Sequence, residues 1–388
     1  MNKIFLLTIF VLGISGSILS LRYLPSPYIW ISLILFPISV YAALTQKKSF
    51  IKLLSFNAGV FILILGGLET CLWTSQALSD KERFKGTYED YTWGYTVTDE
   101  VLGYAPGKGK ATTSNKFLGE KEIYNVTYTI DSNGLRVAPP YKNKENSGCI
   151  LFFGGSVTFG EGLNDNETVP YRVGIKTRGE FRIYNFSFHG YGPHQMLAAI
   201  EHDMVDTIIK CKPEYAIYQA IVNHVDRSAG LSSWDRHGPR YILQSDGSVK
   251  NKGHFNDDKI VGGIGQKIRN EMEKSLLYKK YFDGNEAVSR AHIELFVAII
   301  DKSRRLLEER YPGLKFHMIL WDRPERNRKL IIDLLNEKDV PLHLIEEILP
   351  HYPENRSMYE ISPPYDTHPN AHANERIADY IITHILKK

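Results

Sequence analysis

The sequence predicts an α/β fold in which helices cover both faces of a mostly parallel sheet, a three-layer α/β/α arrangement. From residue 148 onward, short apolar runs typical of buried strands alternate with longer segments of helical periodicity. Upstream, three long apolar segments predict three transmembrane helices, and a small β-rich region follows them. We therefore divide the 388 residues into a transmembrane region over 1–78, a linker and β-rich lead-in over 79–147, and an α/β domain over 148–388.

The apolar segments at the front of the chain are each close to the length that crosses a bilayer. Ile4–Leu21 has eighteen uncharged residues, Tyr28–Leu44 has seventeen, and Leu53–Trp73 carries only Glu69 as a charge. A bilayer core of about 30 Å needs about 20 helical residues at about 1.5 Å each. The first segment could be a cleaved signal peptide, but two more follow it at once, which favours a retained signal anchor. Buried core helices are the alternative, and an interfacial position near the outer end of its span would explain Glu69.

The positive charges around these segments predict their orientation. Lys3 precedes the first segment and Arg22 alone follows it, whereas the loop before the third segment contains Lys47, Lys48 and Lys52. Lysine and arginine accumulate on the cytoplasmic side of membrane proteins. This pattern predicts a multi-pass protein with its N-terminus inside and everything after Trp73 outside. The large domain is then extracytoplasmic. In a bacterial envelope this means the periplasm or the outer face.

The region between the membrane segments and the α/β domain has the composition of a small β structure. Ser79–Lys85 is charged and predicts a linker, and Tyr88–Pro140 is rich in Tyr, Thr and Gly. Ile123–Ile130 alternates as a half-buried strand does, and Asp131–Gly134 is a turn signal. Lys142–Ser147 is polar and predicts a loop before the main domain.

Strands and helices alternate from residue 148 onward. Predicted strands are Ile150–Phe153, Ile183–Phe186, Tyr215–Ile221 and Phe316–Trp321. Predicted helices are Val169–Thr177, His194–Ile209, Glu286–Arg310, Arg323–Glu337 and Ala371–Leu386. In parallel sheets, sites form beyond the carboxyl ends of the strands. The alternation lapses over 226–285, a polar insertion with Trp and Tyr, which we expect to fold as a cap over that site rather than remain a disordered loop.

Two short motifs about two hundred residues apart carry the chemistry. GGSVTFGEG places Ser156 directly after a predicted strand, on a glycine-rich turn, and DTHPN places Asp366 two residues before His368. A serine hydroxyl becomes a nucleophile when an imidazole takes its proton and a carboxylate orients that imidazole. A phosphate-binding GxGxxG loop is the competing reading of the first motif, but its glycine spacing is not reproduced. The pair therefore predicts a serine hydrolase.

These motifs resemble those of the SGNH (GDSL-type) hydrolase family, and two more segments extend the resemblance. GGSVTFGEG resembles the first block, with Ser156 as nucleophile, and NFSFHGYG resembles the second, with Gly190 as a backbone donor. YQAIVNHVDR lies where the third block belongs and supplies Asn223. DTHPN resembles the last block, with His368 as base and Asp366 as its partner. The resemblance implies the flavodoxin-like fold of that family and an oxyanion hole formed by Ser156, Gly190 and Asn223.

The third block departs from the family pattern. The usual Gly-x-Asn-Asp reads IVNH here, which places His224 directly after Asn223. His224 and Arg227 are candidates for substrate contact. The resemblance implies a membrane-anchored esterase that removes acyl groups, acetyl above all, from an envelope carbohydrate. An O-acyltransferase of a surface polysaccharide that uses the same site, and a non-catalytic envelope scaffold, are the alternatives.

The composition excludes several other classes of function. A net charge of +3, from 47 basic and 44 acidic residues, does not favour a nucleic-acid partner. No Cys or His spacing predicts a zinc site, and the resemblance implies neither a metal nor an organic cofactor.

Cys149 and Cys211 lie near predicted strand starts. We expect buried free thiols there, with a disulfide outside the cell as the alternative.

Overall fold

The chain folds into two compact units in the computed structural model. The first is drawn from Met1–Arg83 and Gly263–Ala287, and the second from Phe84–Gly262 and Val288–Lys388. The structure describes residues 27–79, 84–86, 95–141, 148–232, 234–257, 272, 275–281, 288–321, 327–352 and 354–388. The predicted insertion over 226–285 is thus shared between the two units.

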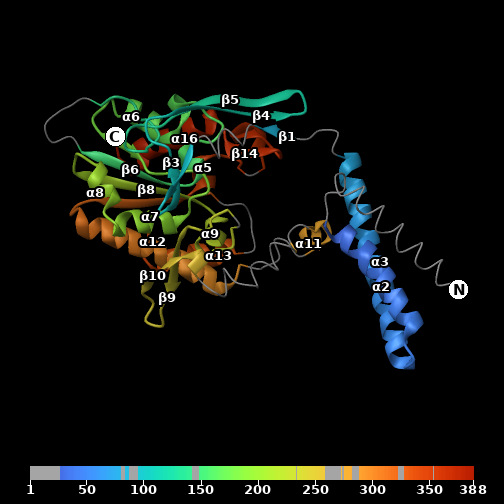
Figure 1. The fold of residues 1–388 in the computed structure, drawn as a ribbon. Helices are drawn as coiled ribbons and strands as arrows, with labels where there is room; N and C mark the ends of the chain where they lie inside the picture. The colour runs from blue at the N-terminus through green and yellow to red at the C-terminus, as the bar shows by residue number, and fades with distance from the viewer. Residues whose placement is uncertain are drawn as a thin grey trace. The chain divides into compact units, whose positions relative to one another are not determined.

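The described part of the first unit contains two long helices and one short one. Helix α2 (Pro27–Thr45) and helix α3 (Ser49–Ser79) pack side by side, and α11 (Leu276–Tyr281) lies against α3 (Figure 1). Gly59 and Gly66 face α2 so closely that a Cβ on either would collide with the hydroxyl of a serine. Small residues of this kind let two helix backbones approach each other within a membrane.

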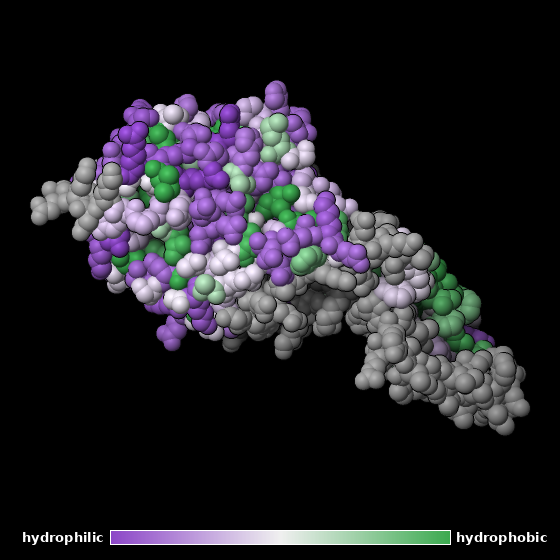
Figure 2. Space-filling model, turned by 90° about the horizontal axis from the view of Figure 1, so that it is seen from above, coloured by the Kyte–Doolittle hydropathy of each residue, from purple (hydrophilic) through white to green (hydrophobic). Residues whose placement is uncertain are grey.

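One helix among the described residues is long and apolar enough to cross a membrane. This is Ser49–Ser75 of α3, whereas the apolar part of α2 covers only Ile34–Thr45. At about 1.5 Å per residue, twelve residues span about 18 Å, short of a core of about 30 Å. The prediction of three spans is therefore supported for one only, and the first predicted span lies outside the described residues. In Figure 2, hydrophobic residues gather on the helices of this unit, while hydrophilic residues cover most of the visible face of the other.

Glu69 connects α3 to the insertion. Its buried carboxylate accepts hydrogen bonds from the hydroxyl of Ser275 at 2.9 Å and from the N–H groups of Leu276 and Leu277 at 2.6 and 2.9 Å. A carboxylate in apolar surroundings requires donors, and the first N–H groups of a helix lack partners within the helix. Glu69 thus satisfies the start of α11 from within α3, and this part of the insertion packs on α3. An interfacial position of Glu69 stays a prediction.

The second unit is built on a five-stranded parallel sheet of order β12-β11-β8-β6-β7. Its strands are β6 (Cys149–Gly154), β7 (Arg182–Asn185), β8 (Pro213–Ile221), β11 (Lys315–Trp321) and β12 (Leu342–Leu344). The prediction of an α/β fold around a parallel sheet is confirmed. The edge strand β12 was not predicted, because three residues are too few to show a period.

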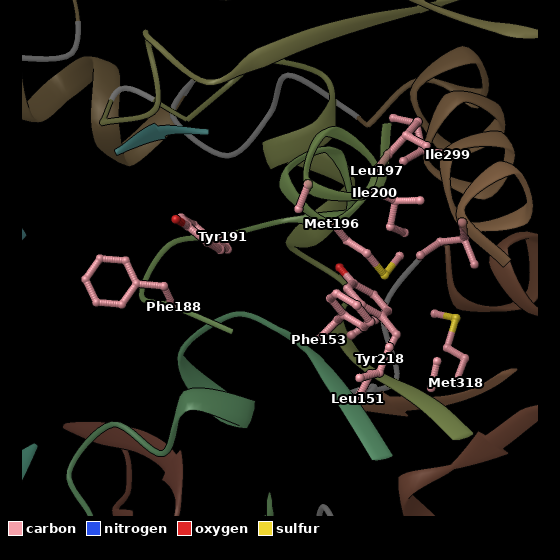
Figure 3. Close-up of a cluster of buried hydrophobic side chains, with 14 of the residues drawn as sticks. Leu151, Phe153, Phe188, Tyr191, Met196, Leu197, Ile200, Tyr218, Ile299 and Met318 are labelled. Carbon is pink, nitrogen blue, oxygen red and sulfur yellow. The ribbon is translucent and has the colours of Figure 1, made fainter. Parts of the chain in front are cut away.

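Helices cover both faces of this sheet, as the alternation of β6 requires. Leu151 and Phe153 point into one core, shared with α7 (Pro193–Glu201) and α12 (Arg290–Arg310). Figure 3 shows these two side chains beside Tyr218 and Met196. Ile150 and Phe152 belong to the opposite core, shared with α6 (Val169–Lys176) and α16 (Ala371–Tyr380). Successive side chains of a strand face opposite sides of a sheet, so a strand buried on both sides is continuously apolar.

The predicted helix over 194–209 is two helices in the structure. Helix α7 ends at Glu201, and α8 (Met204–Ile208) begins after Asp203, whose φ of 56° is left-handed. The other elements of the second unit are α5 (Ser156–Phe159), η1 (Asp165–Glu167), α9 (His224–Ser228), β9 (Pro239–Leu243), β10 (Val249–His254), η2 (Phe255–Asp257), α13 (Arg328–Glu337), α14 (Ile345–Ile348), α15 (Arg356–Tyr359), β13 (Glu360–Ser362), β14 (Asp366–Pro369) and η3 (Ile381–Ile385).

The β-rich lead-in packs against the α/β domain. It consists of β1 (Phe84–Gly86), β2 (Thr96–Asp99), β3 (Gly103–Pro106) and the long hairpin of β4 (Ala111–Leu118) and β5 (Lys121–Thr129). Just after this hairpin, the buried guanidinium of Arg136 donates to the carbonyls of Phe159, Gly160 and Leu163 and pairs with Asp165 at 3.0 Å. These bonds fix the lead-in to the turn that follows β6.

Cys149 and Cys211 form a disulfide, with Cα atoms 6.0 Å apart. The expectation of buried free thiols is therefore wrong. Cys149 begins β6 and Cys211 lies just before β8, and these two strands are neighbours in the sheet. The pairing of the strands brings the thiols together, which neither position shows in the sequence. Cys71 in α3 remains a free thiol.

Candidate active site

The turn after β6 presents Ser156 at the carboxyl end of the sheet. Strand β6 ends at Gly154, and Ser156 begins the short helix α5, which Gly160 ends with a left-handed φ of 86°. A Cβ at Gly155 would lie 2.7 Å from Arg227 Nη1 and 3.0 Å from the Tyr191 carbonyl oxygen. A side chain here would have to displace the Arg227 guanidinium, so glycine at this position lets the backbone beside Ser156 lie close to its neighbours.

The structure brings Ser156, His368 and Asp366 into one chain of hydrogen bonds. His368 Nε2 lies 2.9 Å from Ser156 Oγ, and His368 Nδ1 lies 2.9 Å from Asp366 Oδ1. The backbone N–H of His368 also donates to Asp366 Oδ1 at 3.0 Å. This bond fixes the Asp366 side chain against His368 within the short strand β14. A nucleophile bonded to a base that is itself oriented by a carboxylate is the geometry of serine catalysis.

Asp366 has a second partner that the sequence did not indicate. Lys116 Nζ, from β4 of the lead-in, lies 2.7 Å from Asp366 Oδ2, and both side chains are buried. Burial alone would raise the pKa of Asp366, but the hydrogen bonds from His368 and Lys116 outweigh burial and hold this pKa below its ordinary value. Asp366 is therefore ionised at neutral pH.

A second carboxylate lies at the other nitrogen of the base. Glu161 Oε2 is 3.3 Å from His368 Nε2 and 2.9 Å from His189 Nδ1. Burial alone would lower the pKa of His368, but the charge of Glu161 and the hydrogen bond to Asp366 outweigh burial and raise this pKa above its ordinary value. Glu161 was not among the predicted site residues, although it stands in the same glycine-rich motif as the serine. Lys116 had no signal in the sequence.

The candidate backbone donors are placed at the same edge of the sheet. Gly190, in the loop after β7, has a left-handed φ of 72°, and a Cβ there would lie 2.5 Å from the Tyr104 hydroxyl and 2.8 Å from Trp234 Nε1. Glycine is therefore required at this position. Among the residues that the structure describes, neither the N–H of Ser156 nor that of Gly190 has an acceptor. Both N–H groups remain available to an oxyanion.

The third block presents two buried residues and one exposed one. The His224 ring is buried, with Nδ1 2.6 Å from the Tyr218 hydroxyl and Nε2 3.0 Å from where a Cβ on Gly155 would lie. Burial lowers the pKa of His224 well below its ordinary value, so the ring is neutral. Buried Arg227 donates from Nη1 to the Tyr191 carbonyl at 2.7 Å. Asn223 is exposed at the start of α9, and no described contact brings its amide to Ser156.

The role of Asn223 can be separated from that of a helix cap. Its side chain makes no capping hydrogen bond, so Asn223→Ala should leave the melting temperature nearly unchanged. If the amide donates to the oxyanion, this variant should lower kcat by about 10²–10³ and leave KM nearly unchanged, because the bond forms only in the transition state. Steady-state kinetics on Asn223→Ala and His224→Ala decide the point. If Asn223→Ala keeps more than about a third of wild-type kcat while His224→Ala loses about a hundredfold, His224 rather than Asn223 donates to the oxyanion.

Among the described residues, no group of three or more His, Cys, Asp or Glu side chains could hold a metal ion. No protein-family model matches the chain, and no curated protein matches it.

Several solved structures are similar to the chain at low sequence identity. A G-D-S-L family protein from Desulfitobacterium hafniense DCB-2 is 10% identical, covering 60% of this chain and 95% of that one, with a TM-score of 0.31. An acetyl xylan esterase from the rumen bacterium Butyrivibrio proteoclasticus is 12% identical, covering 73% and 72%, with a TM-score of 0.36. A carbohydrate esterase is 13% identical, covering 71% and 72%, with a TM-score of 0.33. Similarity of this size assigns neither a family nor an activity to the chain.

Proposed function

We propose that this protein is a serine hydrolase that cleaves an ester through an acyl-enzyme. The observation that carries the proposal is the chain of hydrogen bonds from Ser156 through His368 to Asp366. The turn after β6 supplies Ser156, and strand β14 supplies His368 and Asp366. Strand β4 supplies Lys116, which pairs with Asp366. The ionised Asp366 and the half-buried base that it orients match what a serine nucleophile needs.

The reaction follows from these positions. His368 Nε2 takes the proton of Ser156 Oγ as that oxygen attacks the acyl carbonyl carbon, and Asp366 stabilises the imidazolium that forms. The N–H groups of Ser156 and Gly190, with the amide of Asn223, hold the oxyanion, and one such donor contributes about 3 kcal/mol. His368 then gives its proton to the leaving alkoxide. In the second half, His368 takes a proton from water as that oxygen attacks the acyl-enzyme. It then gives this proton to Ser156 Oγ as the bond to the acyl carbon breaks and the acid leaves.

The surroundings of the site favour an acylated carbohydrate as substrate. Trp234 is 59% exposed and its indole lies against Gly190, next to the proposed oxyanion hole. An exposed indole face stacks readily on the apolar face of a sugar ring. Buried Arg227 lies 5.8 Å from the centre of the same indole ring. We propose that the enzyme removes acetyl or other short acyl groups from a glycan outside the cytoplasm.

An ester panel tests this function. The full chain in detergent should release acid from aryl esters and from acetylated oligosaccharides, and Ser156→Ala should release none. The same reactions with an added acceptor sugar distinguish hydrolysis from transfer. Transfer of the acyl group to the sugar in place of acid release would identify an acyltransferase, and no Ser156-dependent reaction of either kind would overturn the proposal.

Membrane orientation gives a further prediction, because the Cys149–Cys211 disulfide is typical of oxidising compartments. A reporter that is active only outside the cytoplasm should be active when fused after Lys85 and inactive when fused after Lys48, as the lysine pattern predicts. A reporter active only in the cytoplasm, fused at the same positions, should give the opposite pattern. The reverse result would place the site in the cytoplasm and exclude an envelope substrate.

A further inference from the structure

The base His368 lies between two carboxylates, one at each ring nitrogen. Asp366 Oδ1 is 2.9 Å from Nδ1, and Glu161 Oε2 is 3.3 Å from Nε2, the nitrogen that also contacts the hydroxyl of Ser156. Asp366 and Glu161 are both buried. The sequence motif for serine catalysis contains only the first of these carboxylates in the role of orienter, so the second requires its own explanation.

The position of Glu161 has a different effect before and after proton transfer. In the resting enzyme Nδ1–H donates to Asp366. Nε2 therefore carries a lone pair, which accepts the hydrogen bond from Ser156, and it has no proton to donate to Glu161. When Nε2 takes the serine proton it becomes a cationic N–H, and the charge of Glu161 then attracts it. An interaction that is stronger in the transition state than in the ground state raises kcat.

The surroundings of Glu161 keep it ionised and in place. Burial alone would raise the pKa of Glu161, but the charge that His368 carries when protonated, the hydrogen bond from His189 and the charge of Lys116 outweigh burial and hold this pKa well below its ordinary value. Burial lowers the pKa of His189 to about 4, so at neutral pH its ring is neutral and Nδ1–H can donate to Glu161. Aromatic rings pack around His189, with the Phe159 ring centre 4.2 Å away.

We propose that Glu161 is a second carboxylate of the catalytic machinery, a positioning residue that stabilises the His368 imidazolium from the side of Ser156. This inference rests on the proposed hydrolase function. His189 holds Glu161 as Lys116 holds Asp366, so each carboxylate has a partner besides the base.

Two cations act on this group from neighbouring elements, Lys116 and Arg136. Lys116 reaches Asp366 from β4, and the guanidinium of Arg136 lies beyond His189, over the rings of Tyr128 and Phe159 at 4.6 and 4.7 Å. Lys116 lowers the pKa of His368, whereas Glu161 raises it. The removal of either charge should therefore move the pH profile, and the two removals should move it in opposite directions.

The test uses the isosteric variant Glu161→Gln in the full chain. The acidic limb of kcat/KM reports the pKa of the free base, which must be neutral to act. Loss of the negative charge lowers the pKa of His368, so the limb should move to lower pH by about one unit, and kcat at the plateau should fall about tenfold or more. The matched control Lys116→Met should move the limb to higher pH. A residue that only supports the fold would not produce shifts of opposite sign.

A second readout does not depend on turnover. The titration of the His368 ring, followed by NMR in histidine-labelled protein and assigned by its loss in His368→Gln, should shift downward in Glu161→Gln. An unshifted titration would overturn the inference, whatever the activity. If Glu161→Gln does not fold, Glu161→Asp keeps the charge further from Nε2 and should give a smaller shift of the same sign, and no shift would again overturn it. If the wild type shows no ester turnover and Glu161→Gln still shifts the His368 titration, the coupling would be supported and the hydrolase function overturned.

Discussion

Replacement of Ser156 by alanine is expected to abolish ester turnover, with kcat falling on the order of 10⁶. Ser156 Oγ is the atom that attacks the acyl carbon, and no other hydroxyl in the described chain contacts His368 Nε2. The loss should appear in kcat and in labelling by a serine-directed phosphonate. His368 should keep its pairing with Asp366, so the melting temperature should stay close to that of the wild type.

A matched control separates the nucleophile from a buried serine of another kind. Ser303 is fully buried and donates to the Ile299 carbonyl at 2.8 Å, within its own helix. Ser303→Ala should keep both turnover and labelling. Equal labelling of Ser156→Ala and the wild type would remove Ser156 from the mechanism.

Asp366→Asn is expected to lower kcat by about 10⁴. In the structure, Asp366 Oδ2 accepts from Lys116 while Oδ1 accepts from both Nδ1 and the backbone N–H of His368. An asparagine has only one acceptor oxygen, and the Lys116 ammonium requires it because lysine can only donate. The amide NH₂ then faces His368 Nδ1, which must accept, and the proton moves to Nε2. That tautomer cannot take the proton of Ser156.

The same geometry predicts a partial rescue. In Asp366→Asn combined with Lys116→Met, the amide can turn so that its oxygen faces His368, which restores Nδ1–H. The double variant should recover part of the kcat that Asp366→Asn loses. If the two substitutions acted independently, their losses in kcat would multiply and the double variant would be slower than either single variant. Kinetics of the two single variants and the double variant form the cycle. More than about a tenth of wild-type kcat in Asp366→Asn alone would show that Asp366 does not control the tautomer.

The local pattern of the sequence was enough for the α/β core. Strand β6 was recognised because its apolar residues are continuous, and the four strands predicted for the α/β domain lie in the parallel sheet. The glycine-rich motif and DTHPN named the three residues that the structure joins by hydrogen bonds. These features depend on periodicity or on spacing within a few residues, which a single sequence contains.

Other features depended on which distant segments pack together. Lys116 contacts Asp366 across 250 residues, and Glu69 caps α11 across about 207, and neither has a local pattern that indicates a partner. The disulfide follows from the pairing of β6 with β8. Of the two spans predicted within the described residues, one is supported, because hydropathy measures composition, whereas the length of a continuous apolar helix decides what crosses a membrane.

The sequence by itself determined the fold class and singled out the serine, histidine and aspartate that the structure joins by hydrogen bonds. Only the tertiary structure decided the charges around that base, since Lys116 and Glu161 reach His368 and its partner through folding rather than through spacing. The physical reason is that secondary structure is specified by short-range sterics and burial, whereas a pKa depends on every charge and on the burial that the folded chain brings to one point.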